Sequence, residues 1–171
     1  ILSVSNTISC ASCHIQENSF SDPNQYSIGV NGDFGFRNAF SLVNIGWNNS
    51  FNWDGSASSL ESQVFEPVTN PIEMANSWSL VEDELNADSQ YRELFKQAFD
   101  IDHIDSTYVA KAIAQFERTL ISYNSRYDKF QRGEVMFTNE ELDGLNIFFT
   151  ERGDCFHCHG NINFMDNTFH N

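Results

Sequence analysis

The chain has little positive charge and no long apolar run. Its 171 residues include 9 lysines and arginines against 24 aspartates and glutamates, which gives a formal net charge of −15. A protein this acidic repels nucleic acids and anionic membrane surfaces, so neither is expected as a partner. No apolar stretch approaches the roughly 20 residues that cross a bilayer, which argues against a transmembrane segment.

A strand-like alternation of apolar and polar residues is also missing, so no stretch is predicted to build a sheet. Helical patterns are present instead. Residues 106–122 carry an apolar stripe at helical spacing, and Lys111 and Glu117 are predicted to turn away from it. The stripe consists of Val109, Ala112, Ile113, Phe116 and Leu120.

Two short segments have the capping-box pattern that begins helices, a serine or threonine followed three residues later by glutamate. They pair Ser79 with Glu82 and Thr138 with Glu141. Residues 18–58, by contrast, have little regular periodicity. A compact domain rarely holds so long a loop unless a ligand orders it, and a large apolar cofactor would supply the missing core. We therefore predict a mainly α-helical chain with long ordered loops.

Cysteine is scarce, and its few copies are not scattered. All four cysteines belong to two copies of Cys-x-x-Cys-His, the attachment signature of c-type haem. Two thiols one helical turn apart reach both vinyl groups at one edge of the porphyrin, and the next histidine then lies beneath the iron as its ligand. The sequence therefore predicts two covalent haems. The first is held by Cys10, Cys13 and His14, and the second by Cys155, Cys158 and His159.

Other interpretations of the cysteines explain less. A four-thiolate zinc site usually separates its two cysteine pairs by about 15–20 residues, whereas here the gap covers most of the chain. Zinc, disulfides and thioredoxin-like redox pairs all leave the histidine after each pair without a role. Covalent haem also implies a protein exported to an oxidising or periplasmic compartment. The chain has no leader pattern, so we expect any export signal to have been removed.

Between and around the two motifs the sequence contains RNAFSLVNIGWNNSFNWDGSASSLESQVFEPVTNPIEM, AIAQFERTLIS and NFMDNTFHN. These segments resemble the bacterial dihaem cytochrome c peroxidases and their relatives that finish tryptophan tryptophylquinone in methylamine dehydrogenase. The resemblance implies two c-type cytochrome-like haem domains. Residues 1–100 would form the N-terminal domain with the peroxidatic haem and its distal pocket. Residues 101–171 would begin the C-terminal domain with the electron-transfer haem, in a chain that is a portion of a longer protein.

The resemblance also implies roles for single residues. Trp53 matches the tryptophan that passes electrons between the haems, and Gln63 matches the glutamine in the pocket over the first haem. Glu73 matches the carboxylate that acts there as acid and base. Pro67 matches a proline beside the open face of the iron, and Asn38 matches an asparagine that binds calcium. From residue type alone, Trp53 would be a core residue, Gln63 a surface amide and Glu73 a carboxylate of a helix N-terminus.

Together these positions imply a peroxidase that reduces hydrogen peroxide to water at the first haem. Electrons would come from a small redox protein, a cytochrome or a cupredoxin, through the second haem and Trp53. A basic rim on that donor would suit the acidic chain, and the resemblance is compatible with a homodimer. One alternative uses peroxide-derived high-valent iron to oxidise a protein substrate. Another is a non-enzymatic dihaem electron carrier.

The chain departs from the family pattern in several places. Ser56 follows Trp-Asp-Gly where the family has arginine, Asn52 precedes Trp53 where many relatives have an aromatic residue, and Phe40 replaces a proline. No histidine lies between positions 14 and 103, where relatives carry a distal haem ligand. We therefore expect a first haem that is five-coordinate or water-bound without reductive activation. The remaining histidines are predicted to be structural or solvent-facing rather than iron ligands; they are His103, His157 and His170.

Overall fold

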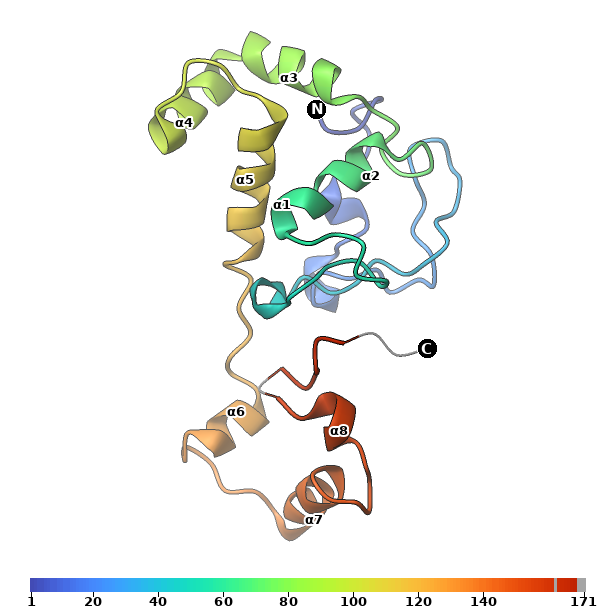
Figure 1. Cartoon of the computed structure of the whole chain (residues 1–171), viewed down its shortest axis with the longest axis vertical. Helices are drawn as coiled ribbons and strands as arrows, with labels where there is room; N and C mark the ends of the chain where they lie inside the picture. The colour runs from blue at the N-terminus through green and yellow to red at the C-terminus, as the bar shows by residue number, and fades with distance from the viewer. Residues whose placement is uncertain (162, 169–171) are drawn as a thin grey trace. The chain divides into compact units, whose positions relative to one another are not determined.

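The computed structural model describes residues 1–161 and 163–168 (Figure 1). The chain forms two compact units, Ile1–Leu120 and Ile121–Asn171. Helix α5 (Ser106–Glu117) lies in the first of them. The family resemblance predicts a different division, after residue 100, which assigns one haem to each part. That division stays a prediction.

The chain is mainly helical, as the sequence predicts. The first unit contains η1 (Cys10–Ser12), η2 (Gln16–Asn18), η3 (Ile45–Trp47), α1 (Leu60–Gln63), α2 (Phe65–Thr69), α3 (Trp78–Ala87), α4 (Ser89–Phe99) and α5. The second contains α6 (Arg126–Gln131), α7 (Asn139–Phe148) and α8 (Phe156–His159). Extended pairing within the described residues is limited to isolated bridges, Ile15 with Ser21, Ile28 with Phe34 and Phe51 with Ala57.

The structure confirms one of the two predicted helix starts and contradicts the other. Thr138 and Glu141 form the predicted capping box of α7, since the Thr138 Oγ1 accepts from the Glu141 N–H at 3.3 Å and Glu141 accepts from the Thr138 N–H at 2.7 Å. The prediction that Ser79 caps a helix was wrong. Ser77 caps α3 instead by accepting from the Leu80 N–H at 3.3 Å, which leaves Ser79 inside the helix.

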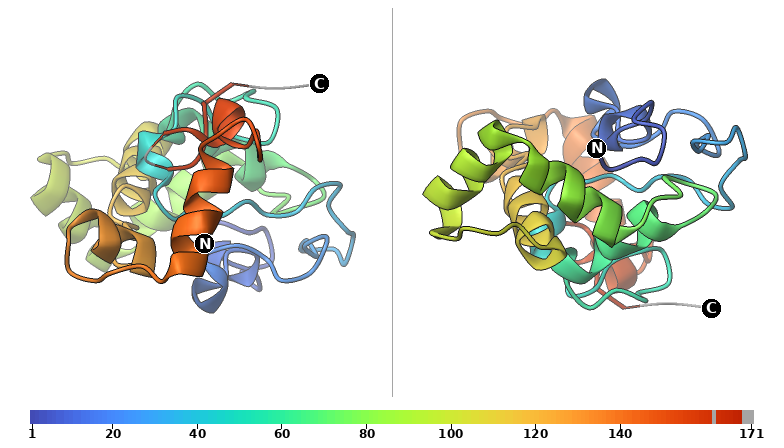
Figure 2. Two further views of the ribbon diagram at one scale, coloured as in Figure 1. Left: turned by 90° about the horizontal axis from the view of Figure 1, so that it is seen from below. Right: turned by 90° about the horizontal axis from the view of Figure 1, so that it is seen from above.

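Glu82, the predicted partner of Ser79, has a different role. Its carboxylate accepts from the Ser106 N–H at 2.6 Å and so binds the first turn of α5. Nearby, the Asn86 side chain donates to the Ile104 carbonyl at 2.7 Å. These bonds join α3 to the start of α5, and the two helices lie against each other in both views of Figure 2.

Helix α5 connects the two parts of the core. Ala114 packs with Leu42 and Leu60 in one buried cluster, and Val109 packs with Val81 in the other. The prediction that Glu117 turns away from the core was wrong, because this side chain is only 7% exposed. The buried face of α5 also includes Ala110 and Ala114, two small residues outside the predicted stripe. Glu117 follows them by seven and three residues, and this spacing returns to the same helix face.

Polar side chains hold the long loop 18–58 in place of regular structure. The buried Asp22 carboxylate accepts from the Asn24 N–H at 2.8 Å, the Asn24 amide at 3.0 Å and the Ser27 hydroxyl at 2.7 Å. Burial alone would raise the pKa of Asp22, but the hydrogen bonds from Ser27 and Asn24 outweigh it and lower the pKa. Hydrogen bonds between polar groups therefore hold this part of the loop in place.

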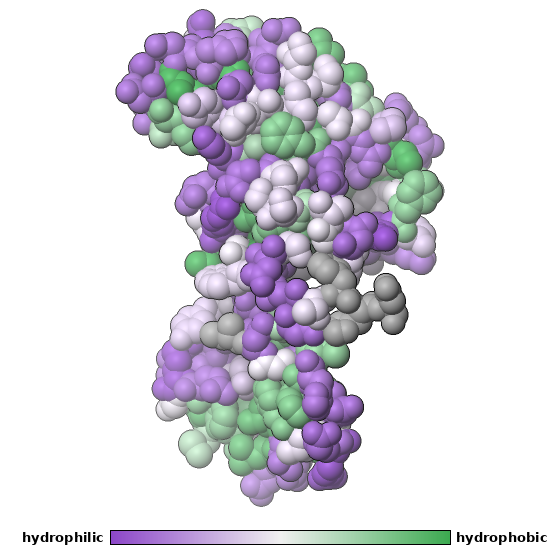
Figure 3. Space-filling model, in the orientation of Figure 1, coloured by the Kyte–Doolittle hydropathy of each residue, from purple (hydrophilic) through white to green (hydrophobic). Residues whose placement is uncertain are grey.

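The second unit has a looser interior. None of its described residues is buried, although aromatic rings gather in it. Phe130 stacks on Phe137 with 3.9 Å between ring centroids, and Phe164 meets Tyr127 at 5.1 Å and Phe148 at 5.6 Å. Figure 3 shows apolar side chains reaching the surface of this unit. Of the helices in the described parts of the chain, none combines the length and apolarity that a bilayer span requires.

Replacing Leu60 by alanine tests the contact between α1 and α5. Leu60 is 1% exposed and packs in one cluster with Ala114, so Leu60→Ala should lower the free energy of unfolding by about 2–5 kcal/mol. Leu80→Ala is the matched control, since Leu80 is 52% exposed and its truncation should cost within about 0.5 kcal/mol. Urea denaturation followed by circular dichroism measures both. Equal losses in the two variants would contradict this packing.

Candidate functional site

A cavity of about 790 Å³ lies within the first unit. This volume falls in the range of roughly 300–1,000 Å³ that is typical of cofactor and ligand sites. Most of its wall is apolar and comes from α2, α5, the chain start and loop 35–42. The first Cys-x-x-Cys-His motif forms part of the same wall, so the structure brings that motif to a space able to hold a large flat group.

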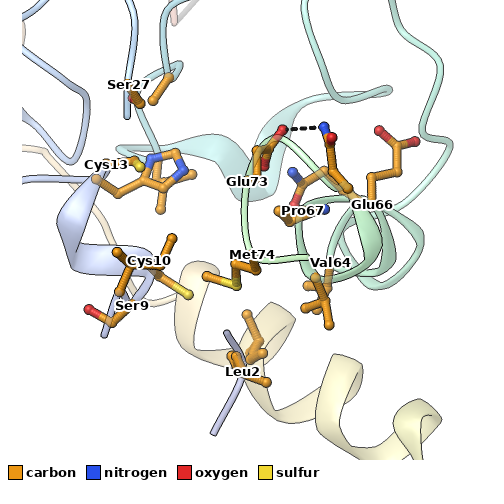
Figure 4. Close-up of a pocket in the computed structure, with 18 of the residues that line it drawn as sticks. Leu2, Ser9, Cys10, Cys13, Ser27, Val64, Glu66, Pro67, Glu73 and Met74 are labelled. Carbon is orange, nitrogen blue, oxygen red and sulfur yellow. Dashed lines mark hydrogen bonds between the residues drawn. The ribbon is translucent and has the colours of Figure 1, made fainter. Parts of the chain in front are cut away.

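The motif residues form one helical turn at the wall of the cavity. The Cys13 and His14 N–H groups both donate to the Cys10 carbonyl, at 3.2 and 2.8 Å, which closes one helical turn. Cys10, Cys13 and His14 all line the cavity. Figure 4 shows both cysteines on one side of it, facing Glu73 and Pro67 on the other.

A hydrogen bond sets the chemical form of His14. Its Nδ1 lies 2.8 Å from the Phe20 carbonyl, and because a carbonyl only accepts, Nδ1 must carry the proton. The lone pair of the neutral ring is then on Nε2, the form that binds iron. Ser19 and Phe20 have φ values of +58° and +57°, a left-handed turn that directs this carbonyl back to the ring. The Phe40 ring packs against the imidazole with 5.9 Å between centroids.

The second motif repeats this arrangement in the other unit. The His159 N–H donates to the Cys155 carbonyl at 2.9 Å, and His159 Nδ1 lies 2.6 Å from the Phe164 carbonyl. Phe164, like Phe20, has a positive φ, here +56°. In both predicted proximal ligands the neutral ring therefore carries its proton on Nδ1 and has its lone pair on Nε2.

The competing interpretations of the cysteines fit the structure less well. All four thiols are free. Surrounding protein desolvates Cys10 and Cys13 even where they open to the cavity, and this burial raises the pKa of both thiols. Reactive redox pairs have lowered pKa values instead. Among the described residues, the metal-like grouping of donor side chains is Glu151, Asp154 and His157, which includes no cysteine, so no zinc–thiolate site is formed there.

Glu73 faces the motif from the opposite wall. Its side chain opens into the cavity, but the surrounding protein desolvates it and raises the pKa of its carboxyl; Glu66 adds to this rise, and a hydrogen bond from Asn70 opposes it. That bond runs from the Asn70 side-chain amide to Glu73 Oε1 at 2.8 Å (Figure 4). Gln63 and Pro67 line the same cavity. The three predicted distal residues, Gln63, Pro67 and Glu73, are thus brought together with the first motif.

The backbone around Glu73 is held by segments distant in the sequence. The Val30 N–H donates to the Glu73 carbonyl at 2.8 Å, and the Met74 N–H donates to the Pro67 carbonyl at 3.2 Å. Gly29 packs directly on the Ile72 carbonyl, where a Cβ atom would have no room. The Gly-rich loop is therefore docked on the segment that carries Glu73.

Trp53 and Asn38 lie at the edge of the cavity and are bonded to each other. The Trp53 indole donates to the Asn38 carbonyl at 2.7 Å, and the Asn38 amide donates to the Asp22 and Asn24 carbonyls at 3.0 and 2.6 Å. Trp53 is 56% exposed, so the alternative of a core tryptophan was wrong. The Asn38 amide already braces the loop, and the calcium role proposed for Asn38 stays a prediction.

Asn52 and Ser56, two residues at which the chain departs from the family pattern, are hydrogen-bonded to each other. The Asn52 amide donates to the Ser56 hydroxyl at 2.9 Å and to Glu66 Oε2 at 2.7 Å. Both residues and Glu66 line the cavity. Glu66, like Asn70 and Glu117, has a place in the site that the sequence analysis missed. Of these three residues, only Glu117 could have been found from the sequence, because it follows Ala110 and Ala114 at helical spacing.

Among the described residues, neither His103 nor His157 lines the cavity. His157 is exposed and lies 3.2 Å from Asp154 and 3.4 Å from Glu151. His103 is exposed and does not line the cavity. His170 lies outside the described residues.

Comparison with known proteins identifies the family of the chain. Residues 1–136 match the family model "Di-haem cytochrome c peroxidase". The chain is 34% identical to the methylamine utilization protein MauG of Methylorubrum extorquens, over 99% of this chain and 48% of that protein. It is 38% identical to the cytochrome c551 peroxidase of Nitrosomonas europaea, over 92% and 47%. The chain thus spans about half the length of these curated relatives.

A solved structure shows the same fold. The crystal structure of a MauG-like protein associated with microbial copper homeostasis superposes with a TM-score of 0.90 at 36% identity, and the match covers 97% of this chain and 50% of that one. The mainly helical fold of this chain therefore has a counterpart of known structure.

Gly29→Ala tests how the Gly-rich loop holds Glu73. The new methyl group would overlap the Ile72 carbonyl oxygen, so the loop must move, at a cost of about 1–3 kcal/mol in the free energy of unfolding. Gly35→Ala is the control in the same loop, because its nearest neighbour there would be the Arg37 carbonyl at an ordinary 3.7 Å. Denaturation midpoints measure both variants. A Gly29→Ala protein as stable as Gly35→Ala would show that the docking is absent.

Proposed function

Because the chain belongs to the di-haem cytochrome c peroxidase family, we propose that it carries the peroxidatic site of an enzyme that reduces hydrogen peroxide to water. One observation supports this above the others. A single cavity has a histidine with a free Nε2 in one wall and a desolvated carboxyl, Glu73, in the opposite wall. An electron carrier has no need of a proton-transferring group at that position.

The residues of the cavity fit a c-type haem. Cys10 and Cys13 would form the thioether bonds, and His14 would ligate the iron through Nε2. The apolar walls match the porphyrin faces, and their size suits a large flat group. Bound there, the haem supplies redox-active iron for peroxide cleavage.

The distal side chains would handle the protons. Peroxide cleavage requires a proton to move from one peroxide oxygen to the other, and a carboxyl group near the reacting atoms can accept it and return it. Because the pKa of Glu73 is raised, its carboxyl group gains and loses a proton at a pH closer to neutrality than an ordinary glutamate does. Asn70 holds the carboxylate in position through its bond to Oε1. Gln63 would orient the peroxide, and Pro67 would limit the space beside it.

The remaining parts of the proposal come from the family. The second motif would hold the electron-transfer haem, and Trp53 would relay its electrons toward the first site. A small cytochrome or cupredoxin with a basic rim would donate them, in the periplasm or a similar exported location. Calcium at Asn38 and a homodimer belong to the same proposal.

Glu73→Gln tests the proposed chemistry. The amide keeps the shape of the side chain but cannot accept the proton, so kcat/KM for peroxide should fall by about 10²–10⁴-fold while haem content is unchanged. In the wild type kcat/KM should rise with pH as Glu73 loses its proton, through a pKa above that of an ordinary glutamate. The assay is oxidation of a reduced cytochrome c by peroxide, in the full-length haem-loaded protein.

Glu66→Gln is the matched control for this test. Glu66 lines the same cavity but accepts a hydrogen bond from Asn52, so its replacement should change kcat/KM only a few-fold. Full activity in Glu73→Gln would contradict the proposal. Haem-loaded wild type without turnover of a reduced cytochrome would favour the protein-oxidising enzyme or the electron carrier.

Haem attachment is tested independently of activity. Intact mass of the full-length protein should show two added haems, and Cys10→Ser with Cys13→Ser should remove one of them. The same pair of changes at Cys155 and Cys158 should remove the other. A colourless wild type, or a mass without added porphyrin, would refute both attachment sites.

A further inference from the structure

Glu117 is a buried acid on the wall of the haem cavity. It lies in the last turn of α5, and Val109, Ile113 and Phe116 of the same helix line the cavity with it. The side chain is 7% exposed, and its Oε2 has no hydrogen-bond partner among the described residues. Burying a carboxyl group without a partner is costly, so the neutral form is favoured there.

The neighbouring charges do not neutralise this acid. Arg118 is next in sequence, but its guanidinium binds both oxygens of Glu61, at 2.8 and 3.1 Å. Burial raises the pKa of Glu117 to about 7, an effect that Arg118 partly opposes and Glu61 reinforces. Cys10 is the titratable group that faces Glu117 from η1, and the charge of Glu117 in turn raises the pKa of the Cys10 thiol. The acid therefore lies close enough to an attachment point of the proposed haem for their charges to interact.

We propose that Glu117 is a redox-linked proton site of the first haem. Ferric iron carries one more positive charge than ferrous iron, and through a poorly screened interior that charge favours the carboxylate. With haem bound, Glu117 would take up a proton from solvent when a reductant supplies one electron to the site, and it would release that proton when the electron leaves. The inference rests on the proposed attachment of haem at Cys10 and Cys13.

A purely structural role makes a different prediction. A carboxyl group that only fills the wall, or that donates a hydrogen bond in every state, leaves the haem potential independent of its protonation. Glu66 and Glu73 also line the cavity and are titratable, so each needs a control variant. Glu117 alone among the three is buried by more than nine-tenths.

Spectroelectrochemical titration of the full-length haem-loaded protein tests the proposal. The midpoint potential of the first haem should fall as pH rises through neutrality, by at most about 59 mV for each tenfold drop in proton concentration. Glu117→Gln should flatten that dependence near neutral pH, whereas Glu66→Gln should keep it. Because Glu73 is itself a titratable group of the cavity, the dependence that remains in Glu73→Gln should be lost when Glu117→Gln is added. The transition of the first haem is identified by its loss in the Cys10→Ser, Cys13→Ser protein.

Two further measurements guard against a variant that fails to fold. Glu61→Gln should move the pH-dependent range to lower pH, because it removes one like charge and frees Arg118 to attract Glu117. In the wild type, redox-difference infrared spectra should show a protonated carboxyl gained on reduction. An unchanged pH slope in folded Glu117→Gln, or a wild-type spectrum without a carboxyl signal, would overturn the inference.

These outcomes separate the inference from the proposed function. A pH-dependent potential that requires Glu117, in a protein that does not turn over peroxide, supports the inference and refutes the peroxidase. Turnover with a flat potential does the reverse. A protein without haem at the first motif refutes both, and the mass measurement detects that case directly.

Discussion

One hydrogen bond, between His14 Nδ1 and the Phe20 carbonyl, governs what the cavity can do. It fixes the tautomer of the imidazole and turns Nε2 toward the space where a cofactor would lie. The bond depends on a left-handed turn at Ser19 and Phe20 and on the edge contact with Phe40. The same bond recurs between His159 and Phe164, which indicates that it belongs to the motif and not to one local sequence.

The opposite wall depends on contacts between distant segments. Glu73 is positioned through Asn70 in its own turn and through Val30 and Gly29 in a loop about 40 residues earlier. That loop has no regular structure of its own, and satisfied polar groups such as Asp22 hold it instead. Loop 18–58 thus contributes to both walls, because Phe20 holds His14 on the proximal side and Gly29 and Val30 hold the segment of Glu73 on the distal side.

Local chemistry could be predicted from the sequence, and long-range packing could not. The Cys-x-x-Cys-His motifs, α5 and the Thr138 cap follow from spacing within a few residues, and the structure contains all of them. The prediction for Ser79 was wrong because Ser77, two residues earlier, accepts from the Leu80 N–H and begins the helix there. Glu117 was misjudged because two alanines widen the buried face of α5. The bonds of Asn52 to Ser56 and Glu66 join residues whose pairing no periodic pattern reports.

The desolvated thiols of the first motif also bear on how the protein matures. Disulfide formation proceeds through the thiolate, so a thiol whose pKa is raised reacts slowly with oxidants. Burial raises the pKa of both Cys10 and Cys13 in the folded chain. In the folded chain, cross-linking of Cys10 with Cys13 would thus be slowed, and both sulfur atoms would stay available for the porphyrin.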